Sequence, residues 1–438
     1  MKATEDVSTD QANHPSSHWM VPFFTIWTGQ ALSLIGSQVV QFALVWWLTQ
    51  LTGSATVLAT ASLVALLPEI VLSPIAGAYV DRWNRRIVMM VADGLVALAS
   101  LWLAYLFWIG ATQVWHVYVI LAIRAVGGSF HWPAMQASTS LMVPKEQLTR
   151  VAGLNQTLNG VLKIACPPLG ALLLAVVPLA GIMLVDVGTA MLAILPLCWA
   201  RIPQPQRDAA GARKSSVWAD MREGLSYISS WPGLMALIGM AMIFKIALTP
   251  AFALIPLLVS KHFGGGAAQL SLLDATVGVG LVLGGLVLSA WGGFRRKIYT
   301  TLLGAVVFGA SFVALGVTPG NAFGMAMVSI GIAGLTIPLI DGPIMAILQG
   351  TVAPEIQGRV FTLMGSLLWI TSPLGLVVAG PVSDRLGLQV WYVAAGLACG
   401  LTGLGGFLLP AIVRIEENHS GRVVARASAL AAASNQVI

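Results

Sequence analysis

Long apolar segments alternate with short polar or glycine-rich ones along most of the 438-residue chain. In each apolar segment hydrophobic residues occupy every face of a helix, which is typical of helices surrounded by lipid rather than of amphipathic surface helices. A helix of about 20 apolar residues crosses the roughly 30 Å hydrocarbon core of a bilayer. The pattern therefore predicts twelve membrane-spanning helices, at 22–51, 55–80, 87–110, 115–141, 151–177, 180–200, 234–259, 268–291, 298–318, 322–348, 360–382 and 388–412.

The composition points to the same class of protein. Hydrophobic residues make up 57% of the chain and charged residues 9%, and a soluble domain of this kind would expose large apolar patches. The net charge of +6 would favour nucleic acid as a partner in a soluble protein. Here the basic residues lie between apolar segments, where membrane orientation accounts for them. We expect an all-α multi-pass membrane protein with no nucleic-acid partner.

The distribution of Lys and Arg among the connections predicts how the chain is oriented. Connections on the cytoplasmic side carry an excess of basic residues, and alternate connections hold nearly all of them here. The opposite set holds only Lys261 and Arg385. The polar N-terminal segment lacks the basic start of a cleavable signal and is interpreted as a cytoplasmic tail. We expect both termini in the cytoplasm and the helices in a bacterial inner membrane.

The longest polar interruption divides the twelve segments into two sets of six. It runs from Arg201 to about Pro232 and is interpreted as a linker, with a surface-lying helix over 217–228 as the alternative. The sets repeat, because the Gly-to-Gly stretch 160–170 matches 365–375. The predicted parts are a tail at 1–21, a six-helix half at 22–200, a linker at 201–233, a six-helix half at 234–413 and a tail at 414–438.

Two deep carboxylates are the first candidates for proton coupling. A charge inside the bilayer costs about 2.5–3.5 kcal/mol on insertion scales and normally faces a cavity or a partner. Glu69 lies about 18 Å from the inner end of its segment at 1.5 Å per residue, and Asp341 is similarly deep in the tenth. Because burial disfavours the charged form, both are expected to take up and release protons. Lys163 and Lys245 are possible counter-ions, and the sequence does not pair them.

Other polar residues inside the segments have two interpretations each. Arg124 either faces a cavity or is one half of a structural ion pair. Asp186, Asp274 and Asp93 lie nearer the segment ends and are more typical of structural partners for Arg or Lys, with Asp186 retained as a coupling candidate. His131 could bind a proton, but a packed helix residue is the preferred interpretation.

The sequence shows no pattern of an active site. It contains no nucleophile–base set, no cluster with metal-ligand spacing and no phosphate-binding G-x-x-x-x-G-K-[ST] motif, so ATP is not an evident energy source. Cys166, Cys198 and Cys399 lie inside apolar segments without disulfide or metal spacing. We expect no enzymatic activity, no cofactor and no metal. The expected partner at this point is the lipid bilayer, and the expected state is a monomer.

Two motifs resemble those of the major facilitator superfamily. Its signature loop has a Gly followed four residues later by Asp-Arg and then a basic pair, and its fourth helix has an Arg followed four residues later by Gly. This resemblance implies twelve helices working by alternating access, a gating role for the loop in which Asp81 pairs with guanidinium groups, and a proton-coupling role for Arg124. Asn84 stands where the family has Gly, and a left-handed conformation is expected there because Asn tolerates it. The matching residues are Gly77, Asp81, Arg82, Arg85 and Arg86 in the loop and Arg124 and Gly128 in the helix.

A closer resemblance concerns the drug-exporting members. Gly153, Pro167 and Gly170 fit their fifth-helix antiporter pattern, in which small residues allow close helix packing and Pro bends the helix. With the stretches 124–134 and 143–149, the chain resembles the macrolide-efflux branch of the drug:proton antiporters over roughly residues 22–412. This implies proton-driven export of amphipathic compounds such as macrolides. The alternatives are export of a native metabolite, lipid or siderophore on the same fold, and a non-transporting receptor or scaffold.

Overall fold

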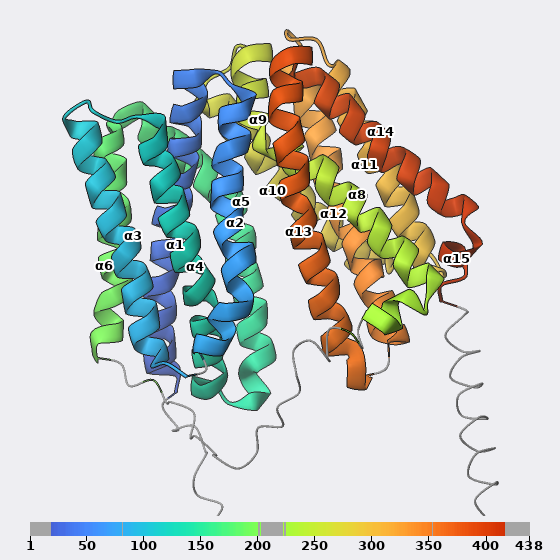
Figure 1. Ribbon diagram of the computed structural model, residues 1–438, viewed down its shortest axis with the longest axis horizontal. Helices are drawn as coiled ribbons and strands as arrows, with labels where there is room; N and C mark the ends of the chain where they lie inside the picture. The colour runs from blue at the N-terminus through green and yellow to red at the C-terminus, as the bar shows by residue number, and fades with distance from the viewer. Residues whose placement is uncertain are drawn as a thin grey trace, which may run out of the picture. The chain divides into compact units, whose positions relative to one another are not determined.

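The computed structural model describes a protein that is almost entirely helical, with no strand among the described residues (Figure 1). Its helices group into two compact units. Unit 1 comprises 1–43, 64–162 and 173–210, and unit 2 comprises 44–63, 163–172 and 211–438. Most of each predicted tail and most of the predicted linker lie outside the described residues, which are 19–80, 82–199, 202, 222, 225–352 and 354–416.

The six predicted N-terminal spans are all present as helices, with ends within a few residues of the expected positions. In unit 1, α3 packs against both α4 and α6. A buried cluster that includes Phe23, Met89, Ala134 and Leu197 joins α1, α3, α4 and α6. The helices are α1 (Met20–Thr52), α2 (Ala55–Val80), α3 (Arg85–Trp108), α4 (Val114–Met142), α5 (Leu148–Val176, after the short 3-10 helix η1 at Lys145–Gln147) and α6 (Leu179–Trp199).

Unit 2 holds the remaining long helices. α11 lies against α12 and α14, and α8 lies against α13 and α14. Their bounds are α8 (Pro232–Ala253), α9 (Ile255–Leu257), α10 (Ala267–Trp291), α11 (Lys297–Val317), α12 (Phe323–Thr351), α13 (Pro354–Leu386), α14 (Leu388–Leu408) and α15 (Pro410–Val413).

The predicted span 234–259 is wrong in one respect, because the structure does not continue it as one helix. α8 ends at Ala253, the single turn α9 follows, and a π-helix, η2, covers Leu258–His262. Pro256 has no backbone N–H and cannot continue the helical hydrogen-bond pattern. The Phe263 N–H then donates to the Leu258 carbonyl at 3.2 Å, which closes the wider π turn.

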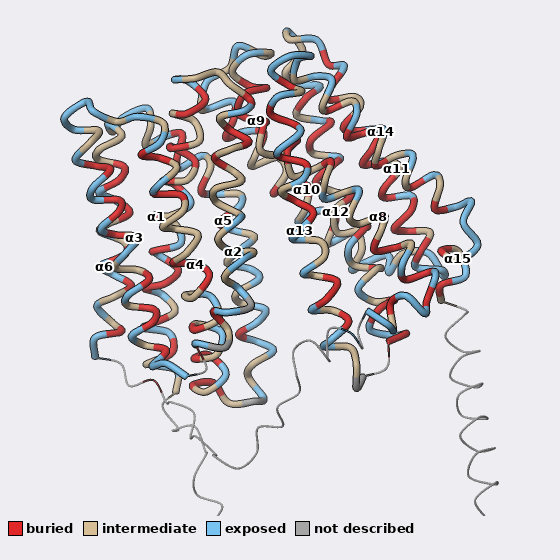
Figure 2. The backbone as a smooth tube through the Cα atoms, viewed as in Figure 1, coloured by how far each residue is buried: buried red, intermediate tan, exposed pale blue. Residues whose placement is uncertain are grey.

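Eleven of the described helices are long and apolar enough to cross a membrane. The remaining long helix, α4, has 29 residues and is more polar because it contains His116, Arg124 and His131. Many large apolar side chains lie on the outside of the helices, among them Leu98, Val328 and Leu401, as Figure 2 shows for the exposed positions in general. These features confirm an all-α multi-pass membrane protein with twelve long helices among the described residues.

Glycines in α10 and α14 allow close helix contacts in unit 2. A Cβ at Gly284 would lie 2.0 Å from the Leu335 carbonyl oxygen of α12. A Cβ at Gly396 would lie 2.6 Å from the Gly309 carbonyl oxygen of α11. Only glycine allows these backbones to approach so closely.

Candidate functional site

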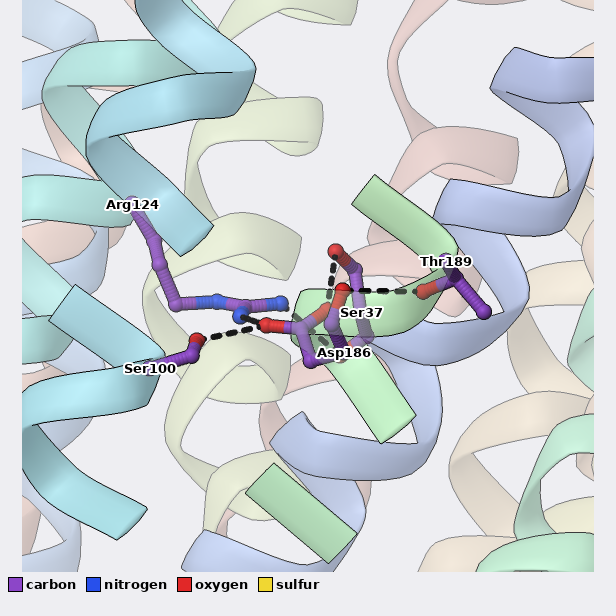
Figure 3. A network of polar contacts seen from close by, with 5 residues as sticks. All are labelled: Ser37, Ser100, Arg124, Asp186 and Thr189. Carbon is purple, nitrogen blue, oxygen red and sulfur yellow. Dashed lines mark hydrogen bonds and ion pairs between the residues drawn. The ribbon is translucent and has the colours of Figure 1, made fainter. Parts of the chain in front are cut away.

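A network of polar side chains lies inside unit 1 and is centred on Asp186 of α6 (Figure 3). Arg124 Nη1 of α4 lies 2.7 Å from Asp186 Oδ2, and the Ser100 hydroxyl of α3 donates to the same oxygen at 2.7 Å. The Ser37 hydroxyl of α1 donates to Asp186 Oδ1 at 3.2 Å, and Arg124 Nη2 donates to the Ser37 carbonyl at 2.9 Å. Four helices therefore meet at one carboxylate.

The small residue Gly36 allows α1 and α6 to pack closely beside this carboxylate. A Cβ at Gly36, next to Ser37, would lie 2.1 Å from the Thr189 hydroxyl of α6. Gly36 thus lets α1 and α6 approach until Ser37 reaches Asp186. The Thr189 hydroxyl donates to the Asp186 carbonyl at 3.0 Å on the same helix.

The Arg124 guanidinium balances the charge of the buried Asp186 carboxylate. The Asp186 side chain is 1% exposed and that of Arg124 13%. Removing one partner of a buried pair leaves an uncompensated charge, at a cost of about 3–5 kcal/mol. The structure shows the ion pair that was one interpretation of Arg124, and it identifies Asp186 as the partner that sequence reasoning could not name.

A polar cavity of about 250 Å³ adjoins the network, and Arg124 forms part of its wall. Asp93 of α3 and His131 of α4 also line it, with His131 Nε2 3.4 Å from Asp93 Oδ1. Gln30 Nε2 of α1 donates to Asp93 Oδ2 at 3.0 Å.

Sequence reasoning undervalued this pair, since it interpreted His131 as a packed helix residue. The signal was the spacing between Arg124 and His131. Seven residues along an α-helix bring two side chains back to nearly the same face.

Unit 2 contains a second cavity, of about 270 Å³, with a mainly apolar wall from α8, α11, α12 and α13. Asp341 and Lys245 are its charged residues, and both side chains are exposed. Lys245 Nζ lies 5.9 Å from the centroid of the Trp369 ring, a distance typical of a cation–π contact. The aromatic residues of the wall are Phe244, Phe252 and Phe308.

Two other intramembrane carboxylates, those of Glu69 and Asp274, do not line either of these cavities. Glu69 is an exposed residue of α2, and Asp274 is half-buried in α10. The coupling role predicted for Glu69 stays a prediction.

The charged turn between α2 and α3 differs from the expectation at Asn84. Its φ of −67° is not left-handed, and its side-chain oxygen accepts a hydrogen bond from the Arg86 N–H at 3.1 Å, so it caps α3. Asn is a favoured capping residue because it satisfies an N–H that lacks a helical partner. Arg85 is buried and donates to the Ala137 carbonyl at 2.9 Å, and Arg86 donates to the Cys198 carbonyl.

The gating role expected for this turn stays a prediction. Asp81 lies outside the described residues, and Gly77 is in the last turns of α2. Arg82 is exposed, and its N–H donates to the Tyr79 carbonyl at 2.9 Å. The basic residues at positions 85 and 86 bind backbone carbonyls of α4 and α6, which fastens α3 to its neighbours at this end.

The antiporter pattern is only partly a packing motif. A Cβ at Gly153 would have no neighbour within 4 Å, so the close packing expected at this glycine is not found. A Cβ at Gly128 of the fourth-helix motif would also have no neighbour within 4 Å. Gly170 is buried, and Pro167 lies inside α5, where it removes a helical hydrogen bond. Open space beside Gly128 is part of the unit 1 cavity.

The fold and these intramembrane charges are those of a polytopic membrane protein, and the comparisons with known proteins identify its class. The sequence profile of the Major Facilitator Superfamily matches residues 26–361, and the chain belongs to that family. Macrolide efflux protein A of Streptococcus pyogenes is 35% identical over 380 residues, covering 87% of this chain and 94% of the relative. The multidrug efflux pump Tap of Mycolicibacterium fortuitum is 27% identical over 397 residues, covering 87% and 94%. The chain is thus an efflux transporter of this superfamily.

Solved structures show the same fold at low sequence identity. A bacterial homologue of the human lysosomal transporter Spinster, inward-facing and unoccupied, has a TM-score of 0.68 at 13% identity and covers 93% of this chain and 99% of its own. A bacterial homologue of the iron transporter ferroportin, inward-facing, has a TM-score of 0.68 at 14% identity and covers 88% and 98%.

Proposed function

We propose that this protein exports amphipathic organic compounds, with macrolide-like drugs as the first class to test, in exchange for protons. The similarity to macrolide efflux proteins over nearly their whole length supports the substrate class. Alternating access between two six-helix halves supplies the mechanism, as the family membership suggests. The distribution of basic residues supports a bacterial inner-membrane location with both termini in the cytoplasm.

One observation carries the proposal for coupled transport. The fully buried Asp186 carboxylate pairs with Arg124 beside a polar cavity, inside helices that are otherwise apolar. Intramembrane ionisable residues are costly and normally mark substrate or ion pathways. A receptor or scaffold has no need of such charges. Because arginine keeps its proton, Arg124 with Asp186 supplies a constant electrostatic environment in which another group exchanges protons.

The unit 2 cavity is the proposed contact point for the substrate. Ligand sites typically hold about 300–1,000 Å³ and combine apolar walls with few polar groups. The volume of about 270 Å³ therefore suits one part of a macrolide-sized molecule. Asp341 offers a carboxylate to a protonated amine of the substrate. A proton on Asp341 would remove that attraction and favour release, which links proton binding to substrate binding.

The charged turn has a proposed gating role in the cycle. The sequence motif around this turn comprises Gly77, Asp81, Arg82, Arg85 and Arg86. Two of its arginines, Arg85 and Arg86, bind carbonyls of neighbouring helices. Breaking and remaking such charge-assisted hydrogen bonds could accompany opening of the inner face. Glu69, deep in α2, is the second coupling carboxylate that we propose.

The test is uptake of a labelled macrolide into inside-out vesicles with an imposed pH gradient, acidic inside. The wild-type protein should accumulate the macrolide, and a protonophore should abolish the accumulation. Asp341→Asn and Glu69→Gln should each reduce gradient-driven uptake to the level of vesicles without the protein, because neither side chain can then carry the proton. Asp274→Asn is the matched control, a carboxylate inside α10 but outside the cavity lining.

Each result has a defined meaning. Normal gradient-driven uptake by either variant removes that carboxylate from the mechanism. Uptake of another metabolite, lipid or siderophore but no macrolide keeps the transporter and changes its substrate. No gradient-driven uptake of any compound, in vesicles that contain folded protein, contradicts the proposed function.

A further inference from the structure

We infer that Asp93 and His131 form a proton-binding site in unit 1 that is emptied and refilled during each transport cycle. This inference rests on the proposed function and adds a further coupled proton to those assigned to Asp341 and Glu69. The site consists of a carboxylate on α3 and an imidazole on α4, both on the wall of the polar cavity.

The geometry leaves room for a proton between the two side chains. His131 Nε2 lies 3.4 Å from Asp93 Oδ1, which is longer than a good N–H···O hydrogen bond of about 2.7–3.2 Å. Nε2 is buried and has no hydrogen-bond partner within the described part of the chain. A protonated imidazole would form a shorter, charge-assisted bond to the carboxylate, so the site is better satisfied when it holds the extra proton.

The neighbouring Arg124–Asp186 pair is unsuited to proton exchange. Asp186 already accepts hydrogen bonds from Arg124, Ser100 and Ser37, and a protonated Asp186 would leave the Arg124 guanidinium without its counter-ion. Within the described part of the chain, Asp93 accepts a side-chain hydrogen bond from the Gln30 amide, and the Asp93 side chain is 12% exposed against 1% for Asp186. The exchangeable proton is therefore assigned to the pair that lines the cavity.

The charges around the site determine what one proton does. The groups facing it are the neutral Gln30, Ser33 and Ser37 of α1 and the charged Arg124 of α4, whose charge Asp186 of α6 balances. With neutral His131 the Asp93–His131 pair has a net charge of −1, and one added proton makes it neutral. The step forms one N–H bond on the imidazole with a proton from water, and release to the other side of the membrane breaks it.

The experiment measures the limiting accumulation of a labelled macrolide in proteoliposomes with the membrane potential held at zero. Each coupled proton changes the limiting accumulation ratio about tenfold per pH unit. Asp93→Asn and His131→Gln should therefore each lower the ratio by about tenfold at a gradient of one unit. Counterflow of labelled against unlabelled macrolide needs no net proton movement and should stay at the wild-type rate. His116→Gln, on the same helix but outside the cavity lining, is the matched control.

The results separate this inference from the proposed function. No gradient-driven accumulation by the wild-type protein overturns the proposed function and the inference with it. Wild-type accumulation that both variants retain in full overturns the inference alone. If a variant also loses counterflow, the inference is tested instead by the pH dependence of macrolide binding to the purified protein. The slope of log Kd against pH gives the number of protons that macrolide binding displaces. This number should be smaller by about one in the variant than in the wild-type protein. An unchanged slope overturns the inference.

Discussion

At the scale of single residues, the charges inside the helices are the features that sequence reasoning found most directly. Arg124, Asp186, Glu69 and Asp341 all stand out because a charge inside an apolar segment is rare and costly. The partners were not visible, since Arg124 and Asp186 are 62 residues apart in the chain. Pairing depends on how α4 and α6 are rotated and packed.

The Arg124–Asp186 pair yields a prediction about stability. Arg124→Gln or Asp186→Asn alone should destabilise the protein by about 3–5 kcal/mol, because each leaves a buried charge without its partner. The double variant should be more stable than either single one, since it buries no charge. Thermal unfolding of each purified variant in detergent, followed with a thiol-reactive dye, measures the order of their melting temperatures. A double variant with the summed loss of both single variants would contradict a buried ion pair.

At the scale of elements, the helices were predictable and their irregular points were not. Hydropathy indicates where a helix lies, because lipid requires the backbone to satisfy its own hydrogen bonds. It does not show that α8 stops at Ala253 or that Asn84 caps α3 in an extended conformation. Those outcomes depend on Pro256 and on which side chain reaches the free N–H groups of α3.

Contact between α10 and α12 gives a prediction for two adjacent glycines. Gly284→Ala should destabilise the protein by about 1–3 kcal/mol, as overpacking does, because its Cβ would lie 2.0 Å from the Leu335 carbonyl oxygen. Gly285→Ala is the matched control, since a Cβ there meets nothing within 4 Å, and alanine favours the helix. Equal melting temperatures for the two variants would show that α10 and α12 are not packed in this way.

At the scale of the whole molecule, contacts cross the boundary that the polar linker predicts. Residues 44–63, from the first half of the sequence, belong to unit 2. Asp384 of α13 contributes hydrogen bonds between residues 44–63 and the rest of unit 2. It accepts hydrogen bonds from the backbone N–H of Ala55 at 2.7 Å and of Thr56 at 3.0 Å, and from the Ser54 hydroxyl at 3.0 Å. A side chain from far along the chain therefore caps α2.

This cap can be tested locally. Asp384→Ala should cost about 1 kcal/mol, the usual effect of losing a capping side chain, and should speed amide hydrogen exchange in the first turn of α2. Asp384→Asn keeps an acceptor oxygen and should have a smaller effect. Hydrogen-exchange mass spectrometry of the peptide that contains Ala55 and Thr56 is the measurement. Unchanged exchange in Asp384→Ala would rule out the cap.

The sequence by itself determined the number, type and approximate ends of the long helices, the positions of the intramembrane charges and the family resemblance. These properties depend on local composition and spacing, and both can be read from the order of residues along the chain. Tertiary structure alone decided that Arg124 meets Asp186, that Asp93 meets His131 across a cavity, and that Asp384 caps α2. Each of these contacts joins residues on different helices, so it depends on helix rotation and on the close approach that residues such as Gly36 permit.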